Sequence, residues 1–264
     1  MVSGLEEIQL ATIVLVIVAG FAAGWVDAVV GGGGLIQLPA LLMVPGITPV
    51  QALATNKMGS IFGTTTSAVT YFRRARPDLK TAVPMAVIAL AGSFGGAILA
   101  SSLPASVFRP VILVALIAVA IFTAFRPTIG TLTKLRYTGH RHYGTAGAIG
   151  LVIGFYDGLL GPGTGSFLII AMVTLLGYSF LGASAKAKIV NMATNLGALA
   201  FFVPNGSLLW GLGLLLGGAN MAGGYLGSRM AITRGSTFIR VVFLVVVAVL
   251  IVKLGHDVWV ESIR

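Results

Sequence analysis

The feature that most constrains this chain is the length of its uncharged stretches. Residues 28–56, 81–108, 158–185 and 189–228 contain no Asp, Glu, Lys or Arg. A helix that crosses a bilayer needs about 20 predominantly apolar residues, so the longest stretches must hold more than one segment. Only 9% of the residues are charged and 57% are hydrophobic, which leaves too little polar surface for a water-soluble domain of 264 residues. The sequence therefore predicts an all-α polytopic membrane protein.

The same apolar runs argue against a membrane β-barrel and define the predicted segments. Barrel strands alternate apolar and polar residues, whereas residues 111–125 and 241–252 show no such alternation. Glycines, prolines and polar clusters divide the chain into ten predicted segments, at 8–25, 35–45, 49–72, 81–101, 107–125, 143–160, 165–178, 182–203, 209–229 and 237–254. Segments 35–45 and 165–178 are short for a full crossing, so whether they cross or are re-entrant stays open.

The net charge of +10 is explained by loop positions rather than by a nucleic-acid partner. Basic residues gather at 73–80, 126–141 and 229–240, and loops rich in Lys and Arg remain on the cytoplasmic side of a membrane. The uncharged loops 101–107 and 203–208 then face outward. On this basis we expect a multi-pass protein of the cytoplasmic (inner) membrane with both termini outside.

The residues offer no cofactor or metal chemistry. The chain has no cysteine, and its three histidines lie in a charged loop, at His140 and His142, or near the C-terminus, at His256. We interpret all three as solvated side chains at the membrane boundary rather than as metal ligands. The sequence predicts no cofactor and no enzyme activity.

A sequence motif near the start of the chain recurs 130 residues later. Gly24–Asp27 with the following Gly31–Gly34 matches Gly154–Asp157 with the following Gly161–Gly165. The charge pattern gives the two halves opposite orientations, an architecture that is typical of secondary transporters. We therefore divide the chain into a first membrane repeat, a cytoplasmic basic linker and a second membrane repeat, at residues 1–125, 126–142 and 143–264.

Each half carries a lysine inside a predicted membrane segment. An ionised lysine at that depth costs at least about 2.5–3.5 kcal/mol, so Lys57 and Lys188 mark a substrate pathway unless they reach the membrane surface. Further polar residues share their helical stripes or adjoin them. These residues are Ser60, Thr64 and Asn56 beside Lys57, and Asn191, Asn195 and Thr194 beside Lys188.

The glycine clusters predict unwound turns that are followed by short helices. Glycine runs do not sustain a helix, and the exposed N–H groups at a helix start carry partial positive charge. We expect backbone donors to an anion from Gly33, Gly34, Gly163, Thr164, Gly165 and Ser166. Asp27 and Asp157 precede the clusters, and three roles stay open for them: proton carriers, counter-ions to the lysines, or acceptors for loose N–H groups.

The paired Gly-x-x-Asp motifs, together with Ala54–Lys57 and with Lys188, Asn191 and Asn195, resemble the sulfite exporter TauE/SafE family over nearly the whole chain. The resemblance implies a membrane transporter for small sulfur-containing anions such as sulfite, sulfonates or sulfoacetate. The second motif departs from a plain glycine run at Pro162 and Thr164, which argues against equal roles for the two breaks.

The resulting prediction is a transporter that exports a small oxyanion by alternating access around a site in mid-membrane. An anion channel that uses the same lysines is one alternative. An intramembrane enzyme that uses Asp27 and Asp157 is a second alternative. A homodimer is left open.

Overall fold

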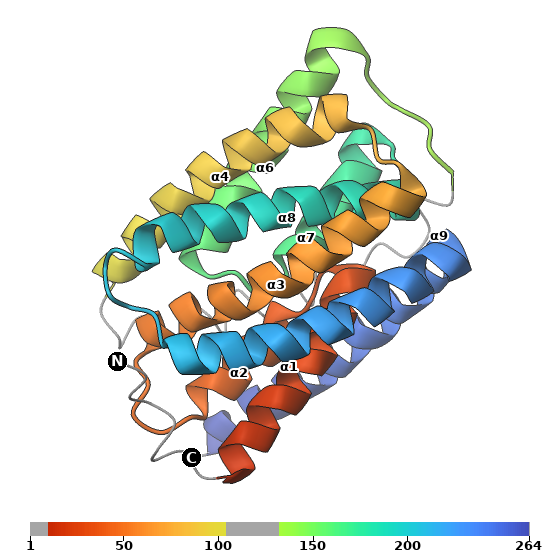
Figure 1. Ribbon diagram of the computed structural model, residues 1–264. Coiled ribbons are helices and arrows are strands. Elements are labelled where there is room, and N and C mark those ends of the chain that lie inside the picture. Colours follow the sequence, from red (N-terminus) through yellow and green to blue (C-terminus); the bar gives the residue numbers. More distant parts are fainter. Residues whose placement is uncertain (1–9, 104–131, 264) are drawn as a thin grey trace.

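The computed structural model describes residues 10–103 and 132–263, and every regular element in these ranges is a helix (Figure 1). The predicted all-α class is thus confirmed for the described residues. The helices are α1 (Leu10–Val30), α2 (Gly34–Leu42), α3 (Pro49–Ala75), α4 (Leu79–Ser102), α6 (Gly139–Leu159), α7 (Thr164–Ala171), the π-helical turn η1 (Met172–Leu176), α8 (Phe180–Phe202) and α9 (Trp210–Ile263). The predicted segment 107–125 lies outside the described residues.

Most helix limits agree with the predicted segments to within a few residues. α9 is divided by Gly235, whose φ of 71° is not helical, so it corresponds to the two predicted segments 209–229 and 237–254. α1 continues to Val30, beyond the predicted end at residue 25. α6 begins at Gly139, so the last four residues of the predicted linker 126–142 belong to this helix.

The described helices form two bundles that pack against each other (Figure 1). In the first bundle, α1 and α3 pack on α9, and α2 packs on α1 and α3. In the second bundle, α4 packs on α6 and α8, and α7 packs on α6 and α8. The two bundles meet chiefly where α3 lies against α8, with further contacts between α1 and α7.

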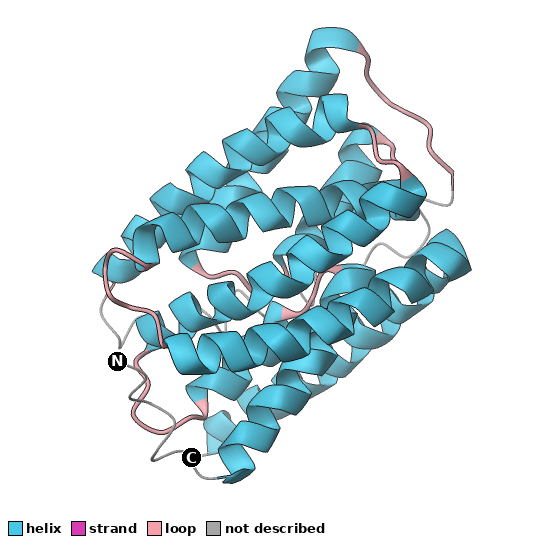
Figure 2. Ribbon diagram, viewed as in Figure 1, coloured by secondary structure: helices cyan, strands magenta, loops and turns pink. Residues whose placement is uncertain are grey.

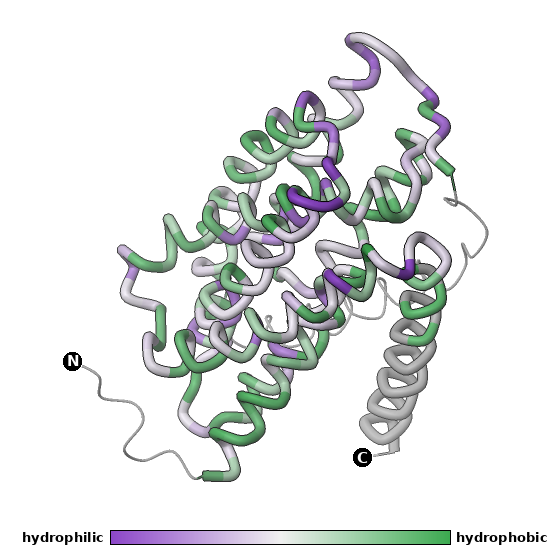
Figure 3. The backbone as a smooth tube through the Cα atoms, turned by 45° about the vertical axis from the view of Figure 1, so that its right-hand side comes forward, coloured by the Kyte–Doolittle hydropathy of each residue, from purple (hydrophilic) through white to green (hydrophobic). Residues whose placement is uncertain are grey.

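The outer surface of the bundles is hydrophobic, as expected for lipid contact. Figure 3 shows hydrophobic residues along most of the described helices, and large apolar side chains such as Val18 on α1 and Val87 on α4 are exposed. α1 and α4 are long and apolar enough, by length and composition, to cross a membrane. By contrast, α2 has nine residues, and its length of about 14 Å is less than half of a ~30 Å hydrocarbon layer.

Small residues let the helices approach closely, as is common in membranes. Gly158 of α6 lies so close to α4 that a Cβ atom there would stand 1.9 Å from the carbonyl oxygen of Ser93. The Ser93 hydroxyl in turn donates to the carbonyl oxygen of Thr194 on α8, at 2.7 Å. Close backbone contacts therefore hold α4 against α6, and a hydrogen bond to the backbone joins α4 to α8.

One of the histidines is buried, contrary to the prediction. His142 is 5% exposed, and its Nε2 lies 3.0 Å from both the Thr81 and the Tyr178 hydroxyl oxygens. The Thr81 hydroxyl donates to Asp78, the residue that caps α4. The prediction failed because α6 already begins at Gly139, so position 142 packs between helices instead of lying in a loop.

The close contact of α4 and α6 yields a test with a matched control. We expect Gly158→Ala to lower the apparent melting temperature of the detergent-solubilised protein strongly, because the added methyl group forces α4 and α6 apart. Gly144→Ala in the same helix meets nothing within 4 Å and should leave the melting temperature unchanged or slightly higher. Equal melting temperatures for the two variants would contradict this packing.

Candidate functional site

The two glycine-containing breaks meet in the middle of the molecule. Figure 2 shows them as short loops inside the bundle rather than at its ends. α1 stops at Val30 because Gly31 adopts a positive φ of 83°, and α6 is followed by Gly161 and Gly163 with φ of 87° and 80°. Such values favour glycine. The predicted unwound turns are therefore present in both halves of the chain.

Direct hydrogen bonds join the two breaks. The backbone N–H of Ser166 donates to the carbonyl oxygen of Gly31 at 3.1 Å, and the Ser166 hydroxyl donates to the carbonyl oxygen of Val30 at 2.8 Å. A Cβ atom on Gly31 would lie 2.1 Å from the carbonyl carbon of Gly165. The two copies of the motif thus touch through their backbones. The carbonyl oxygens that the end of α1 leaves without helical partners accept hydrogen bonds from Ser166.

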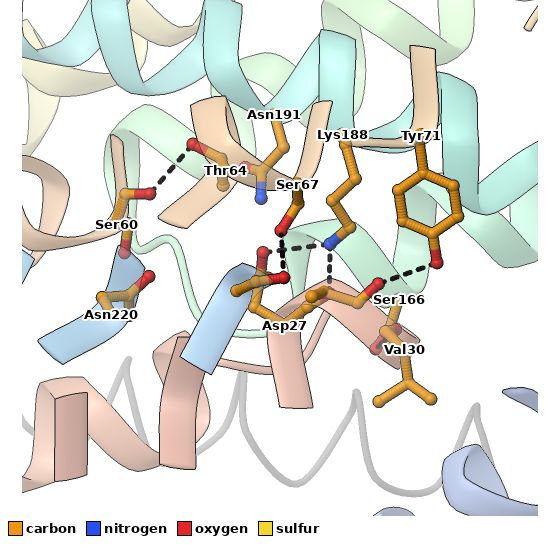
Figure 4. Close-up of polar contacts among 12 residues, drawn as sticks. Asp27, Val30, Ser60, Thr64, Ser67, Tyr71, Ser166, Lys188, Asn191 and Asn220 are labelled. Atoms are coloured by element: carbon orange, nitrogen blue, oxygen red, sulfur yellow. Dashed lines mark hydrogen bonds and ion pairs between the residues drawn. The ribbon is translucent and has the colours of Figure 1, made fainter. Parts of the chain in front are cut away.

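Two buried ion pairs lie beside this crossing, and each joins a lysine of one half to an aspartate of the other. Lys57 Nζ is 2.7 Å from Asp157 Oδ2. Lys188 Nζ is 2.9 Å from Asp27 Oδ2, as Figure 4 shows. The lysine side chains are 1% and 0% exposed. The lysines therefore do not reach the membrane surface. Each aspartate is thus paired with a lysine of the other half in this structure.

The two pairs differ in their further hydrogen bonds. Lys188 also donates to the backbone carbonyl oxygen of Asp27, so two oxygens of one residue hold its ammonium group. Asp157 instead has a second donor, because the Thr164 hydroxyl binds its Oδ1 at 2.6 Å. The Asp27 side chain is 13% exposed and the Asp157 side chain 2%.

A small polar cavity lies between the breaks and the two long helices α3 and α8. Its volume of about 20 Å³ suits roughly one water molecule. An oxyanion of several heavy atoms needs more room, so the lining must move apart to admit one. The lining consists of Asp27, Gly31, Gly34, Asn56, Lys57, Ser60, Asp157, Gly161, Gly163, Thr164, Gly165, Asn191 and Asn195.

Most of the predicted site residues thus line one cavity, and five of them do not. Thr64 and Thr194 bond to carbonyl oxygens of their own helices, and Thr64 also accepts from Asn195. Gly33 packs against the carbonyl oxygen of Ala23. The other two residues outside the lining are Ser166, which joins the breaks, and Lys188, whose ammonium group binds the Asp27 carboxylate.

Sequence reasoning missed a second polar group next to the cavity. Asn220 of α9 donates to Gln37 Oε1 at 2.7 Å and to the carbonyl oxygen of Gly20, and Gln37 Nε2 donates to the carbonyl oxygen of Asn56. These amides tie the short helix α2 to α1, α3 and α9. Both residues interrupt apolar runs, and a polar residue within a membrane segment is the signal that could have identified them.

Comparisons with known proteins agree with this picture. The family model described as "Sulfite exporter TauE/SafE" matches residues 16–254. The chain is 36% identical to "Probable membrane transporter protein ORF9" of a Sinorhizobium species, with 96% of each chain covered. It is 32% identical to a "Probable membrane transporter protein" of Haemophilus influenzae, with 95% of this chain and 97% of the relative covered. It is 35% identical to "Probable membrane transporter protein YfcA" of Escherichia coli, with 89% and 86% covered. No solved structure matches the chain.

The crossing of the breaks can be tested with two glycines of similar conformation. Gly31 and Gly46 both have positive φ, at 83° and 78°, but only Gly31 touches another backbone. Gly46→Ala should cost about 1–2 kcal/mol of stability from its conformation alone. Gly31→Ala should cost at least about 1–3 kcal/mol more, because the methyl group overlaps Gly165. Chemical denaturation in detergent measures both variants, and a similar loss for the two would mean that the breaks do not meet.

Proposed function

Since this chain belongs to the sulfite exporter TauE/SafE family of membrane transporters, we propose that it carries a small sulfur-containing oxyanion across the cytoplasmic membrane. Sulfite, a sulfonate or sulfoacetate has the chemistry that this site would recognise. The observation that carries the proposal is a polar cavity with a buried lysine, Lys57, at the crossing of two helix breaks.

The burial of charge supports a transport site. Two lysines and two aspartates in the middle of an apolar bundle carry a large desolvation cost, and apolar side chains would pack there without it. Ionisable residues within membrane segments are typically retained where a substrate or ion passes. The breaks add support, because non-helical backbone at membrane depth is tolerated only where protein buries it or a cavity adjoins it.

In the proposed bound state, the anion lies against the Lys57 ammonium group in a widened form of the cavity. Neutral donors come from Asn56 and Ser60 on α3 and from Asn191 and Asn195 on α8. Residues at the start of α7 also line this cavity, and a helix N-terminus suits an oxyanion. Hydrogen bonds to charged oxygens are roughly twice as strong as neutral ones, which favours a sulfonate or sulfite group over a neutral solute.

The two bundles supply a way to move such a site from one side of the membrane to the other. The proposed repeats contribute α1–α4 and α6–α9, and each bundle combines three helices of one repeat with one long helix of the other. We interpret this exchange as the product of inverted repeats, and we infer that the two bundles rock against each other around the central site. At about 20 Å³ the cavity is too small for such an anion, so the described conformation corresponds to a state without substrate. The proposed orientation places both termini outside.

Export follows from the charge of the substrate. Moving one negative charge outward across an inside-negative membrane releases about 2.3 kcal/mol per 100 mV. A tenfold concentration ratio corresponds to about 1.4 kcal/mol. A divalent anion could therefore leave against a gradient of roughly a thousandfold without a coupled ion, whereas uptake would require coupling.

Anion binding can be measured directly on the purified protein. We expect millimolar sulfite, sulfoacetate or methanesulfonate to raise the apparent melting temperature, because a ligand that binds the folded state stabilises it by mass action. Dimethyl sulfone has the shape of methanesulfonate without its charge and should have no effect. A protein that responds to none of the three anions, or equally to dimethyl sulfone, would contradict the proposed anion site.

The cavity donors can be tested with one substitution at two places. Asn191→Ala removes an amide that lines the cavity and should weaken methanesulfonate binding by about ten- to a hundredfold, since a hydrogen bond to a charged group contributes about 1.5–3 kcal/mol. Asn205→Ala makes the same change in an exposed turn and should bind like wild type. Titration by thermal shift gives both affinities, and equal affinities would remove Asn191 from the site.

A further inference from the structure

Both ion pairs cross from one bundle to the other. Lys57 on α3 belongs to the first bundle and Asp157 on α6 to the second, while Lys188 on α8 belongs to the second bundle and Asp27 on α1 to the first. Any rocking of the bundles therefore changes the geometry of these two pairs before it changes contacts within a bundle. The pairs are the charged connections on which the proposed motion acts.

The pairs are equivalent in sequence but not in structure. Both lysines are buried, but Lys57 lines the central cavity, whereas Lys188 is not among the described residues that line it. The cause lies partly in the second motif. Thr164 binds the Asp157 carboxylate, but the residue at the corresponding place in the first motif is Gly34, which has no side chain to offer Asp27.

We propose that the two pairs have different roles: Lys57 leaves Asp157 to bind the head of the anion, whereas the Lys188–Asp27 pair stays closed as a fixed pivot between the bundles. This inference rests on the proposed anion transport. It replaces the expectation that both ammonium groups contact the solute with a site in which a single ammonium group does so.

The hydrogen bonds show why Lys57 is the one that can leave. When Lys57 turns to an anion, Asp157 keeps the Thr164 hydroxyl as a donor at 2.6 Å and is not stripped of partners. Lys57 already lines the cavity, so an anion held there would lie within reach of its side chain.

Lys188 is held in the opposite way. Its ammonium group binds both the carboxylate and the backbone carbonyl oxygen of Asp27, so leaving would break two bonds at once. That carbonyl oxygen belongs to the last turn of α1, directly before the break at Gly31. The pair thus fastens α8 to the point where α1 ends, and this position suits a pivot.

The test compares two charge-neutral double variants, Lys188→Met with Asp27→Asn and Lys57→Met with Asp157→Asn. Each removes one ion pair without leaving a buried charge unpaired. The probe is methanesulfonate, a permanently charged monoanion, and the readouts are apparent affinity by thermal shift and tracer exchange in proteoliposomes. We expect the Lys188–Asp27 variant to bind within about threefold of the wild-type affinity. The Lys57–Asp157 variant should lose affinity by more than thirtyfold while remaining folded.

The single variant Lys188→Met tests the pivot without any ligand. It leaves the Asp27 carboxylate buried and unpaired, so its apparent melting temperature should fall by several degrees, and adding Asp27→Asn should restore most of the loss. The pivot role is overturned if Lys188→Met melts like wild type, or if the Asp27→Asn change restores nothing.

The affinity measurements can overturn the other half of the proposal. Loss of methanesulfonate binding in the Lys188–Asp27 variant as large as in the Lys57–Asp157 variant would show that both lysines contact the anion. Retained binding in the Lys57–Asp157 variant would remove Lys57 from the site. If wild type itself binds no anion, the proposed function fails, and the melting temperatures still decide whether the Lys188–Asp27 pair is a structural connection.

Discussion

The docking of the two bundles depends on two lysine charges that are buried in the middle of an apolar helical structure. An ammonium group at that depth needs a partner, and the partners are carboxylates of the opposite half of the chain. Because each lysine pairs across the molecule rather than with its own repeat, neither half can satisfy its charges alone. The arrangement makes docking of the two bundles a condition for burying the charges, and it fixes the relative position of α1, α3, α6 and α8.

The helix breaks follow from the same requirement. An uninterrupted α1 would have no free carbonyl oxygens near Val30, and an uninterrupted α6 would continue through the place where the cavity lies. Once the helices stop, their backbone groups need new partners in a medium without water. Ser166 supplies two of these partners, through its N–H and its hydroxyl group. The glycines permit the turns, and the contact of Gly31 with Gly165 lets the two turns lie against each other.

The sequence predicted the helical class, most segment limits and most of the residues around the cavity. Those predictions rest on local signals, namely the length of apolar runs, the positions of Gly and Pro and the spacing of polar residues on one helix face. The pairing of Lys57 with Asp157 and of Lys188 with Asp27 could not be chosen over the other roles, because it depends on how the two halves dock. The same limit explains His142, whose burial arises from contacts with residues far away in sequence. α1 runs past its predicted end because its residues stay helical up to the turn at Gly31, and Lys188 pairs with the Asp27 that this extension contains.

The charge balance of the site bears on the direction of the proposed transport. Two ammonium groups and two carboxylates sum to zero, so in the proposed cycle the membrane field would exert little net force on the empty site. Once an anion binds, the moving part of the protein carries the charge of the anion, and the field acts on that step alone. In an inside-negative membrane this force points outward. A site with unpaired lysines would bind an anion more tightly, but it would cancel the charge on which the potential acts. Pairing with the aspartates therefore lowers the affinity for the anion but leaves the loaded site with a net negative charge. The membrane potential can drive such a site outward, as an exporter without a coupled ion requires.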